Sequence, residues 1–114
     1  MNLSFAELRA ANEKRGIEWE GKPNGIANLE FCTIELGGES GEVMDAVKKL
    51  LRTLRGMKNK GLTERDCINK VAEECADVVI CADRIAECVG VNLNKAVRDK
   101  FNKTSNEHGF NTKL

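Results

Sequence analysis

The longest apolar pattern in this chain is a seam whose members alternate at spacings of three and four residues, as one side of an α-helix does. The seam residues are Leu29, Cys32, Leu36, Val43, Ala46 and Leu50. They predict a long helix over about residues 26–55. One seam position, three residues after Leu36 and four before Val43, holds Glu39. We therefore expect an acidic side chain on the side of this helix that faces the core.

Two shorter helices are predicted from their end signals. Ser4 starts a capping box, which predicts a helix over about residues 5–15 that stops at Gly16. Near the other end of the chain, Asn92 is expected to cap a last helix that Gly109 ends.

Another helix is predicted to start at a capping box formed by Thr63 and Asp66. Its expected inner seam is Ile68, Val71, Cys75, Val78, Ala82, Ile85 and Val89. Residues 78–82 are apolar on every side of this helix. Because a helical segment that is apolar all round must be covered all round, we expect a partner subunit to cover part of it.

The composition favours an all-α fold, a bundle of about four helices forming one domain over residues 1–114. Charged residues make up 32% of the chain and aromatic residues 4%, which suits an aliphatic helical core better than a β-sandwich. The 18 acidic residues balance the 18 basic ones, so no net field attracts a nucleic acid polymer or a membrane. The N-terminal segment lacks the apolar centre of a secretory signal. We expect a cytoplasmic protein.

Five cysteines are present, an odd number without a C-x-x-C pair. A zinc site needs closer cysteines or several histidines, and His108 is the one histidine. We therefore interpret the cysteines as reduced thiols that act mainly as small apolar residues.

Two sets of carboxylates fall on predicted helices at helical spacing. Glu35, Glu39 and Glu42 share one stripe, and the second set is Glu73, Glu74 and Asp77. Burying a carboxylate costs several kcal/mol unless a cation compensates it. Oxygen ligands without nearby histidine or cysteine favour Mg²⁺, or Mn²⁺ as a substitute, and a ferritin-like di-iron site would need Glu-x-x-His. A solvated acidic face is the alternative, because an acid-rich chain produces such spacings by chance.

These motifs occur together in a recognisable order. The residues are Glu39 and Glu42 in ELGGESGEV, Glu74 and Asp77 in EECADVV, and Lys100, Phe101 and Asn102 ahead of HGF. Over roughly residues 26–110 the pattern resembles the MazG-like, all-α nucleoside triphosphate pyrophosphohydrolase superfamily.

The resemblance implies a helical bundle that assembles as a dimer or a dimer of dimers. It also implies Mg²⁺-dependent hydrolysis of the α–β phosphoanhydride bond of (deoxy)nucleoside triphosphates, which cleanses the nucleotide pool. The implied metal ligands are Glu39, Glu42, Glu74 and Asp77. Glu35 would act with Glu39 in catalysis, as a second-metal ligand or as a base that orients water. Lys100 and Asn102 would contact the nucleotide.

Trp19 lies in a predicted loop over residues 16–25, where it either stacks on a nucleobase or covers the core. Two other functions stay open. One is phosphoribosyl-ATP pyrophosphohydrolase, which shares the chemistry of the superfamily. The other is a helical dimer without catalytic activity, whose acidic residues serve nucleotide binding or an interaction surface.

Overall fold

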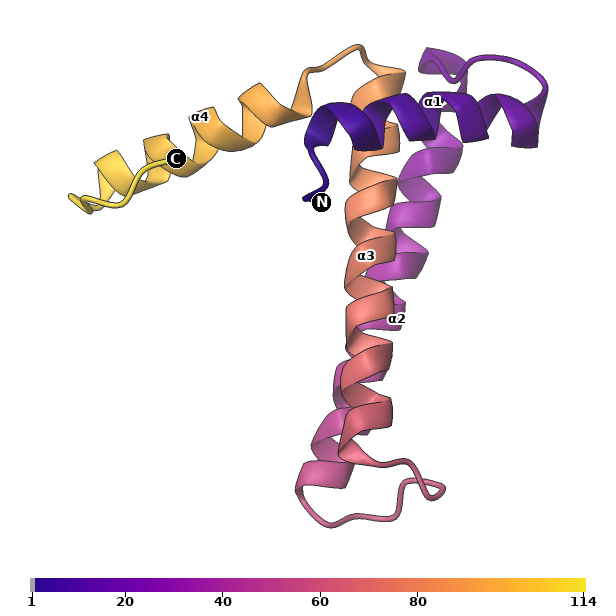
Figure 1. Cartoon of the computed structure of the whole chain (residues 1–114), viewed down its shortest axis with the longest axis vertical. Coiled ribbons are helices and arrows are strands. Elements are labelled where there is room, and N and C mark those ends of the chain that lie inside the picture. Colours follow the sequence, from indigo (N-terminus) through magenta and orange to yellow (C-terminus); the bar gives the residue numbers. More distant parts are fainter. Residues whose placement is uncertain (1) are drawn as a thin grey trace. The chain divides into compact units, whose positions relative to one another are not determined.

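The computed structural model describes residues 2–114, and its regular elements within that range are all helical. In chain order they are α1 (Phe5–Glu20), the short 3₁₀ helix η1 (Ile26–Asn28), α2 (Leu29–Leu54), α3 (Glu64–Cys88) and α4 (Leu93–Glu107) (Figure 1). The predicted all-α class with four helices is confirmed. None of the helices between residues 2 and 114 carries an apolar stretch long enough to cross a membrane.

The chain divides into two compact units. One combines the N-terminal segment up to Leu29 with Asp83–Leu114, and the other is Glu30–Ala82. Helix α3 therefore contributes its first 19 residues, 64–82, to the second unit and its last turns to the first.

Helix α1 starts as predicted but extends further. The Glu7 N–H donates to the Ser4 hydroxyl at 3.1 Å, and the Glu7 carboxylate accepts from the Ser4 N–H at 3.0 Å. The helix does not stop at Gly16, because a glycine inside a helix costs only about 1 kcal/mol. It ends at Gly21, whose φ of 74° and N–H bond to the Ile17 carbonyl form a left-handed cap. The predicted boundary is wrong by about one turn.

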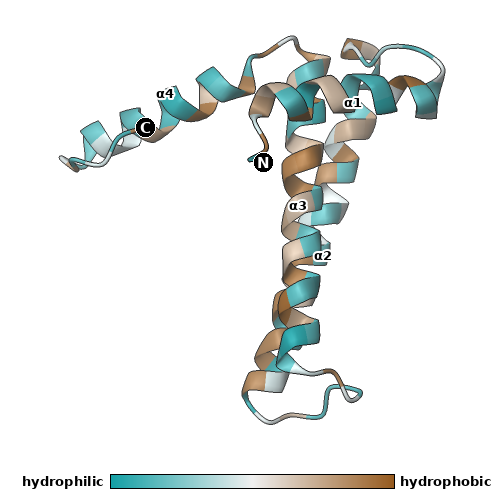
Figure 2. Ribbon diagram, viewed as in Figure 1, coloured by the Kyte–Doolittle hydropathy of each residue, from teal (hydrophilic) through white to brown (hydrophobic). Residues whose placement is uncertain are grey.

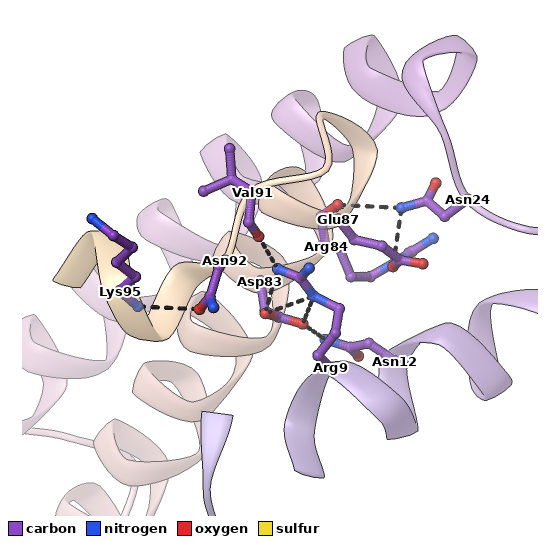
Figure 3. A network of polar contacts seen from close by, with 9 residues as sticks. All are labelled: Arg9, Asn12, Asn24, Asp83, Arg84, Glu87, Val91, Asn92 and Lys95. Atoms are coloured by element: carbon purple, nitrogen blue, oxygen red, sulfur yellow. Dashed lines mark hydrogen bonds and ion pairs between the residues drawn. The ribbon is translucent and has the colours of Figure 1, made fainter. Parts of the chain in front are cut away.

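A buried polar network holds the first unit together (Figure 3). Asp83, near the end of α3, is 1% exposed and accepts from Arg9 Nε at 3.1 and 3.2 Å. Asn12 donates to the same carboxylate at 3.0 Å, and Arg9 also donates to the Val91 carbonyl at 2.9 Å. Beside it, buried Arg84 donates to Glu20 at 2.9 Å. The network fastens α1 to the last turns of α3 through paired charges.

Helix α4 has the predicted ends. The Lys95 N–H donates to the Asn92 side chain at 3.1 Å, which caps the helix, and Gly109 adopts a φ of 69° after its last turn. The chain then turns back along α4. The Leu114 N–H donates to the Asn102 side chain at 2.8 Å, and the Asn102 amide donates to the Leu114 carbonyl at 3.3 Å.

The second unit is an antiparallel pair formed by α2 and α3. The hydroxyl of Thr53, at the end of α2, lies 3.6 Å from the sulfur of Cys67, at the start of α3. The connecting loop is fastened by Asn59, whose amide donates to the Lys49 carbonyl at 2.7 Å and to Thr53 at 2.6 Å. The Asp66 N–H donates to the Thr63 hydroxyl at 3.1 Å, and the predicted capping box of α3 is present.

Among the described residues of the second unit, the apolar side chains that are fully buried are all small, and the acidic Glu74 is buried as well. The apolar ones are Cys32, Ala46, Cys67 and Cys81. Because these side chains are small, their burial removes little apolar area from water. Four of the five cysteines are buried, Cys75 is exposed, and all five are free thiols.

The predicted inner seam of α3 is wrong by about one position. The buried line runs through Cys67, Glu74, Cys81 and Cys88, spaced by seven residues, whereas Ile68 and Val89 are exposed. Helix α3 carries two adjacent apolar stripes, and periodicity alone does not tell which of them packs inside the chain. The seam of α2 agrees better, because Cys32 and Ala46 are buried.

Candidate metal centre

Three carboxylates meet between the two helices of the second unit. Glu39 lies in the middle of α2, and Glu74 and Asp77 lie one turn apart on α3. One carboxylate oxygen from each residue lies within 4.8 Å of the others. The antiparallel pairing brings the middle of both helices together, and a spacing of three residues directs Glu74 and Asp77 to one side of α3. We refer to Glu39, Glu74 and Asp77 as the acidic trio.

The trio combines burial with mutual repulsion. The side chain of Glu74 is 8% exposed, while Glu39 and Asp77 remain accessible to solvent. Partial burial raises the pKa of Glu39 above its ordinary value of 4.5, and the negative charges of Asp77, Glu74, Glu42 and Glu35 raise it further. The ionised form of Glu39 is therefore disfavoured, which a divalent cation between the carboxylates would reverse.

One cation of the chain already reaches this cluster. The Lys70 ammonium lies 3.1 Å from Glu74, one turn along α3, and 3.3 Å from exposed Glu73. These carboxylates raise the pKa of Lys70. This single ammonium compensates Glu74, but it does not balance all the negative charge of the cluster. The sequence interpretation missed Lys70, although its spacing of four residues from Glu74 is a recognisable helical signal.

The donor set fits a hard divalent ion. All three trio members offer carboxylate oxygens, which Mg²⁺ and Mn²⁺ prefer. Mg²⁺ in proteins usually binds to few carboxylates and keeps several water molecules, and two partly accessible carboxylates leave room for them. Converging carboxylates are one requirement for binding such an ion, and exposed acidic groups also converge where no metal binds.

The other acidic residues expected at the site are near it but outside the trio. Glu42 and Glu35 influence the pKa of Glu39 through their charges. Glu42 lies three residues after Glu39 and is exposed, and Glu35 lies four residues before it and is half-buried. Among the described residues, the three-carboxylate group therefore comprises three of the four expected metal ligands.

The three residues expected to bind the nucleotide all belong to the first unit. Lys100 is exposed on α4, in a groove of about 600 Å³ that Leu93, Phe101 and Phe110 also line. Asn102 is half-buried, with its amide bonded to the Leu114 main chain.

Trp19 is in helix α1 and not in a loop, because α1 extends to Glu20. Trp19 is 66% exposed, so it does not cover a core within the chain. The Arg15 guanidinium lies 4.9 Å from the ring centre and that of Arg84 lies 5.8 Å away. Both distances suit cation–π contacts.

No family model, curated protein or solved structure matches this chain. The MazG-like resemblance is thus a hypothesis that rests on its motif residues.

Proposed function

We propose that this chain is a Mg²⁺-dependent nucleoside triphosphate pyrophosphohydrolase of the MazG-like kind. It hydrolyses the α–β phosphoanhydride bond of (deoxy)nucleoside triphosphates, releases the monophosphate and pyrophosphate, and thereby cleanses the nucleotide pool. The observation that supports this proposal is the acidic trio, which brings oxygens from two helices within 4.8 Å of one another. Such a cluster carries a repulsive cost that folding alone does not require.

Each acidic residue has a role in the proposal. Glu39, Glu74 and Asp77 would hold the ion, and Glu42 would complete the set from the next turn of α2. When bound, Mg²⁺ or its substitute Mn²⁺ would neutralise phosphate charge and make water more acidic. Glu35, one turn from Glu39, would orient the attacking water and accept its proton, or would bind a second ion.

The proposed reaction is a simple hydrolysis. The water oxygen forms a bond to the α-phosphorus, and the bond from that phosphorus to the bridging oxygen breaks. Pyrophosphate leaves with the bridging oxygen, and the proton of the water passes to the carboxylate that orients it or to solvent. No oxidant or second substrate is needed.

A small hollow in the second unit places two lysines near the acidic trio, each of which also pairs with a carboxylate: Lys49 with Asp45, and Lys70 with Glu73 and Glu74. Lys49 and Lys70 line a hollow of about 260 Å³ together with Ala46, Cys67 and Asp66. Lys70 joins this hollow to the acidic trio, because its ammonium contacts Glu74 at 3.1 Å. Cationic side chains beside a metal site would stabilise the negative charge of the β- and γ-phosphates of a bound nucleotide. In this proposal Lys49 and Lys70 bind the departing pyrophosphate.

The remaining expectations belong to the same proposal. Lys100, Asn102 and Trp19 are expected to contact the nucleotide. The enzyme is expected to act in the cytoplasm, as a homodimer or homotetramer.

The direct test is product analysis. Purified protein is incubated with a panel of nucleoside and deoxynucleoside triphosphates and Mg²⁺, and pyrophosphate and orthophosphate are measured separately. Pyrophosphate with the monophosphate supports the proposal. Orthophosphate as the first product, or no turnover with any nucleotide, contradicts it. Faster hydrolysis of phosphoribosyl-ATP than of every other substrate would favour that alternative enzyme.

Two variants tie the activity to the trio. Glu39→Gln and Asp77→Asn should each abolish turnover while circular dichroism shows an unchanged helix content. Glu73→Gln is the matched control, because Glu73 lies beside Glu74 on α3 with a side chain 67% exposed. Wild-type activity in Glu39→Gln or Asp77→Asn would remove that residue from the site.

A further inference from the structure

The residues that follow α4 fold back along that helix as a short segment, residues 110–114, which we call the strap. Gly109, with a φ of 69°, reverses the direction of the chain. The Phe110 N–H then donates to the Ser105 carbonyl at 2.8 Å. Figure 1 shows the strap in yellow, returning beside α4. The strap therefore lies against the second half of this helix.

The last residue of the strap occupies the side-chain amide of Asn102. The Asn102 Oδ1 atom accepts from the Leu114 N–H at 2.8 Å, and Asn102 Nδ2 donates to the main-chain oxygen of Leu114 at 3.3 Å. One amide thus pairs with a donor and an acceptor of a single residue. An asparagine uses the same two atoms when it recognises the edge of a base such as adenine. The strap therefore offers Asn102 the hydrogen-bonding pattern that a nucleobase edge would offer.

The first residue of the strap lies at the groove that contains Lys100. Phe110 and Lys100 line this groove together with Phe101. The Phe110 ring also stacks on His108, with the ring centres 5.4 Å apart. Lys100 and Asn102 are the two residues of α4 that are expected to contact the nucleotide. The strap thus adjoins both of them.

Few contacts hold the strap in place. Every residue from 106 to 114 is exposed, and Phe110 and Leu114 remain 61% and 55% exposed. Lys113 adds a bond to the Phe110 carbonyl at 3.3 Å and a contact with the Asn106 side chain. Hydrophilic residues make up most of α4 (Figure 2), so the strap covers little apolar surface. Segments held by a few exposed hydrogen bonds open at a low free energy. The strap can therefore open while α4 stays folded.

We propose that the strap is an autoinhibitory contact, which occupies Asn102 in place of a nucleobase and which the nucleotide must displace. In the closed form the amide of Asn102 pairs with Leu114, and in the open form it binds the nucleotide. Because only the open fraction binds, the measured dissociation constant exceeds the intrinsic one by the reciprocal of that fraction. The inference rests on the proposed function, which assigns Asn102 to the nucleotide, and adds a regulatory contact to it.

The first test compares two substitutions of one residue. Leu114→Pro removes the main-chain N–H that donates to Asn102, whereas Leu114→Ala keeps that N–H and shortens an exposed side chain. Calorimetry measures the binding of the α,β-methylene analogues of dATP, dCTP, dGTP and dTTP in the presence of Mg²⁺. Because the net worth of one hydrogen bond is modest, Leu114→Pro should bind an analogue about threefold to tenfold more tightly than the wild type. Leu114→Ala should bind it as the wild type does.

Inorganic tripolyphosphate is the control ligand, because it has no base for Asn102 to recognise. Its binding should be the same for the wild type and both variants, and an equal gain in Leu114→Pro would contradict the mimicry of a nucleobase. If Leu114→Pro binds no analogue more tightly while the wild type releases pyrophosphate from nucleotides, the inference is wrong and the proposed function stands. If no analogue binds to any of the three proteins, the inference falls, and the hydrolysis assay decides whether the proposed function falls with it.

A second measurement follows the strap in the wild-type protein. In nuclear magnetic resonance spectra, a saturating analogue should move the amide proton signal of Leu114 toward the position of a solvated amide. The side-chain amide signals of Asn102 should shift at the same analogue concentrations. A Leu114 signal that stays in place at saturation would show that the nucleotide binds without displacing the strap, and would overturn the proposal.

Discussion

Two buried carboxylates of this protein, Asp83 and Glu74, have surroundings of opposite charge. Asp83, in the first unit, is 1% exposed and is met by a guanidinium from Arg9 and an amide from Asn12 (Figure 3). Glu74, in the second unit, is 6% exposed, contacts the single ammonium of Lys70 and has two further carboxylates, Glu39 and Asp77, within 4.8 Å. One buried charge is neutralised by the chain, and the other lies within an excess of negative charge.

This difference separates a structural charge from a candidate functional one. A buried charge whose partners are all supplied by the chain is explained by folding alone. A group of carboxylates that raises the pKa of its own member Glu39 is costly in the folded state. Sites with that property are candidates for binding or catalysis.

The largest expected effect is the loss of the structural pair. Asp83→Ala leaves Arg9 and Asn12 without their buried acceptor, and we expect the free energy of unfolding to fall by about 3–5 kcal/mol. Urea denaturation measures this change. Asp99→Ala is the matched control, because Asp99 pairs with Lys95 on the exposed side of α4 and should change stability by about 1 kcal/mol at most. Equal effects of the two substitutions would contradict a structural role for Asp83.

A smaller effect is expected at the start of α3, the helix that carries both carboxylates. Thr63→Ala removes the hydroxyl that accepts from the Asp66 N–H, and we expect a loss of about 1 kcal/mol. The loss should be the same with and without Mg²⁺, because the cap does not contact the acidic trio. A loss that appears only in the presence of Mg²⁺ would show that the cap and the trio are coupled.

The acidic trio should respond to mutation in the opposite direction. Without metal, Glu39→Gln should stabilise the protein slightly at neutral pH, because it removes one of several repelling charges. The pKa of Glu39 is raised in the folded state, so the wild type loses stability as the pH rises from the ordinary carboxyl pKa through the raised one. The advantage of Glu39→Gln should be largest near neutral pH and should vanish in acid. Denaturation at several pH values checks this, and a destabilised variant at neutral pH would contradict the repulsion.

Lys70 gives the smallest and most specific comparison. Lys70→Met removes the one ammonium that contacts Glu74, so the metal-free protein should melt at a slightly lower temperature. The rise in melting temperature on adding Mg²⁺ should then exceed that of the wild type, because the ion takes over the lost compensation. An unchanged response to Mg²⁺ would mean that Lys70 and the ion do not compete for the same carboxylates.

The sequence pattern predicted the four helices, most of their caps and the inward position of Glu39. These features depend on local spacing and on side chains three or four residues apart. The C-terminal end of α1 and the buried stripe of α3 are predicted wrongly. A helix tolerates an internal glycine such as Gly16, and local spacing does not decide which of two adjacent apolar stripes on α3 is buried.

The long-range pairs could not be predicted from spacing. Arg9 and Asp83 are 74 residues apart, and no periodicity relates them. The sequence does place Asp83 and Arg84 on α3, but it does not show that both are buried with partners on α1. At the acidic trio, the spacing brought Glu74 and Asp77 to one side of α3, and the antiparallel pairing with α2 decided that Glu39 joins them while Glu42 lies outside.

Calorimetric titration of the metal-free protein with Mg²⁺ tests the central claim most directly. The account predicts saturable binding to the wild type and to Glu73→Gln, with a stabilisation of about 2.7 kcal/mol at one hundred times the dissociation constant. Glu39→Gln and Asp77→Asn should lose both the heat of binding and the stabilisation. No binding to the wild type, or equal binding to all four proteins, would contradict the claim that these carboxylates are held together for a divalent cation.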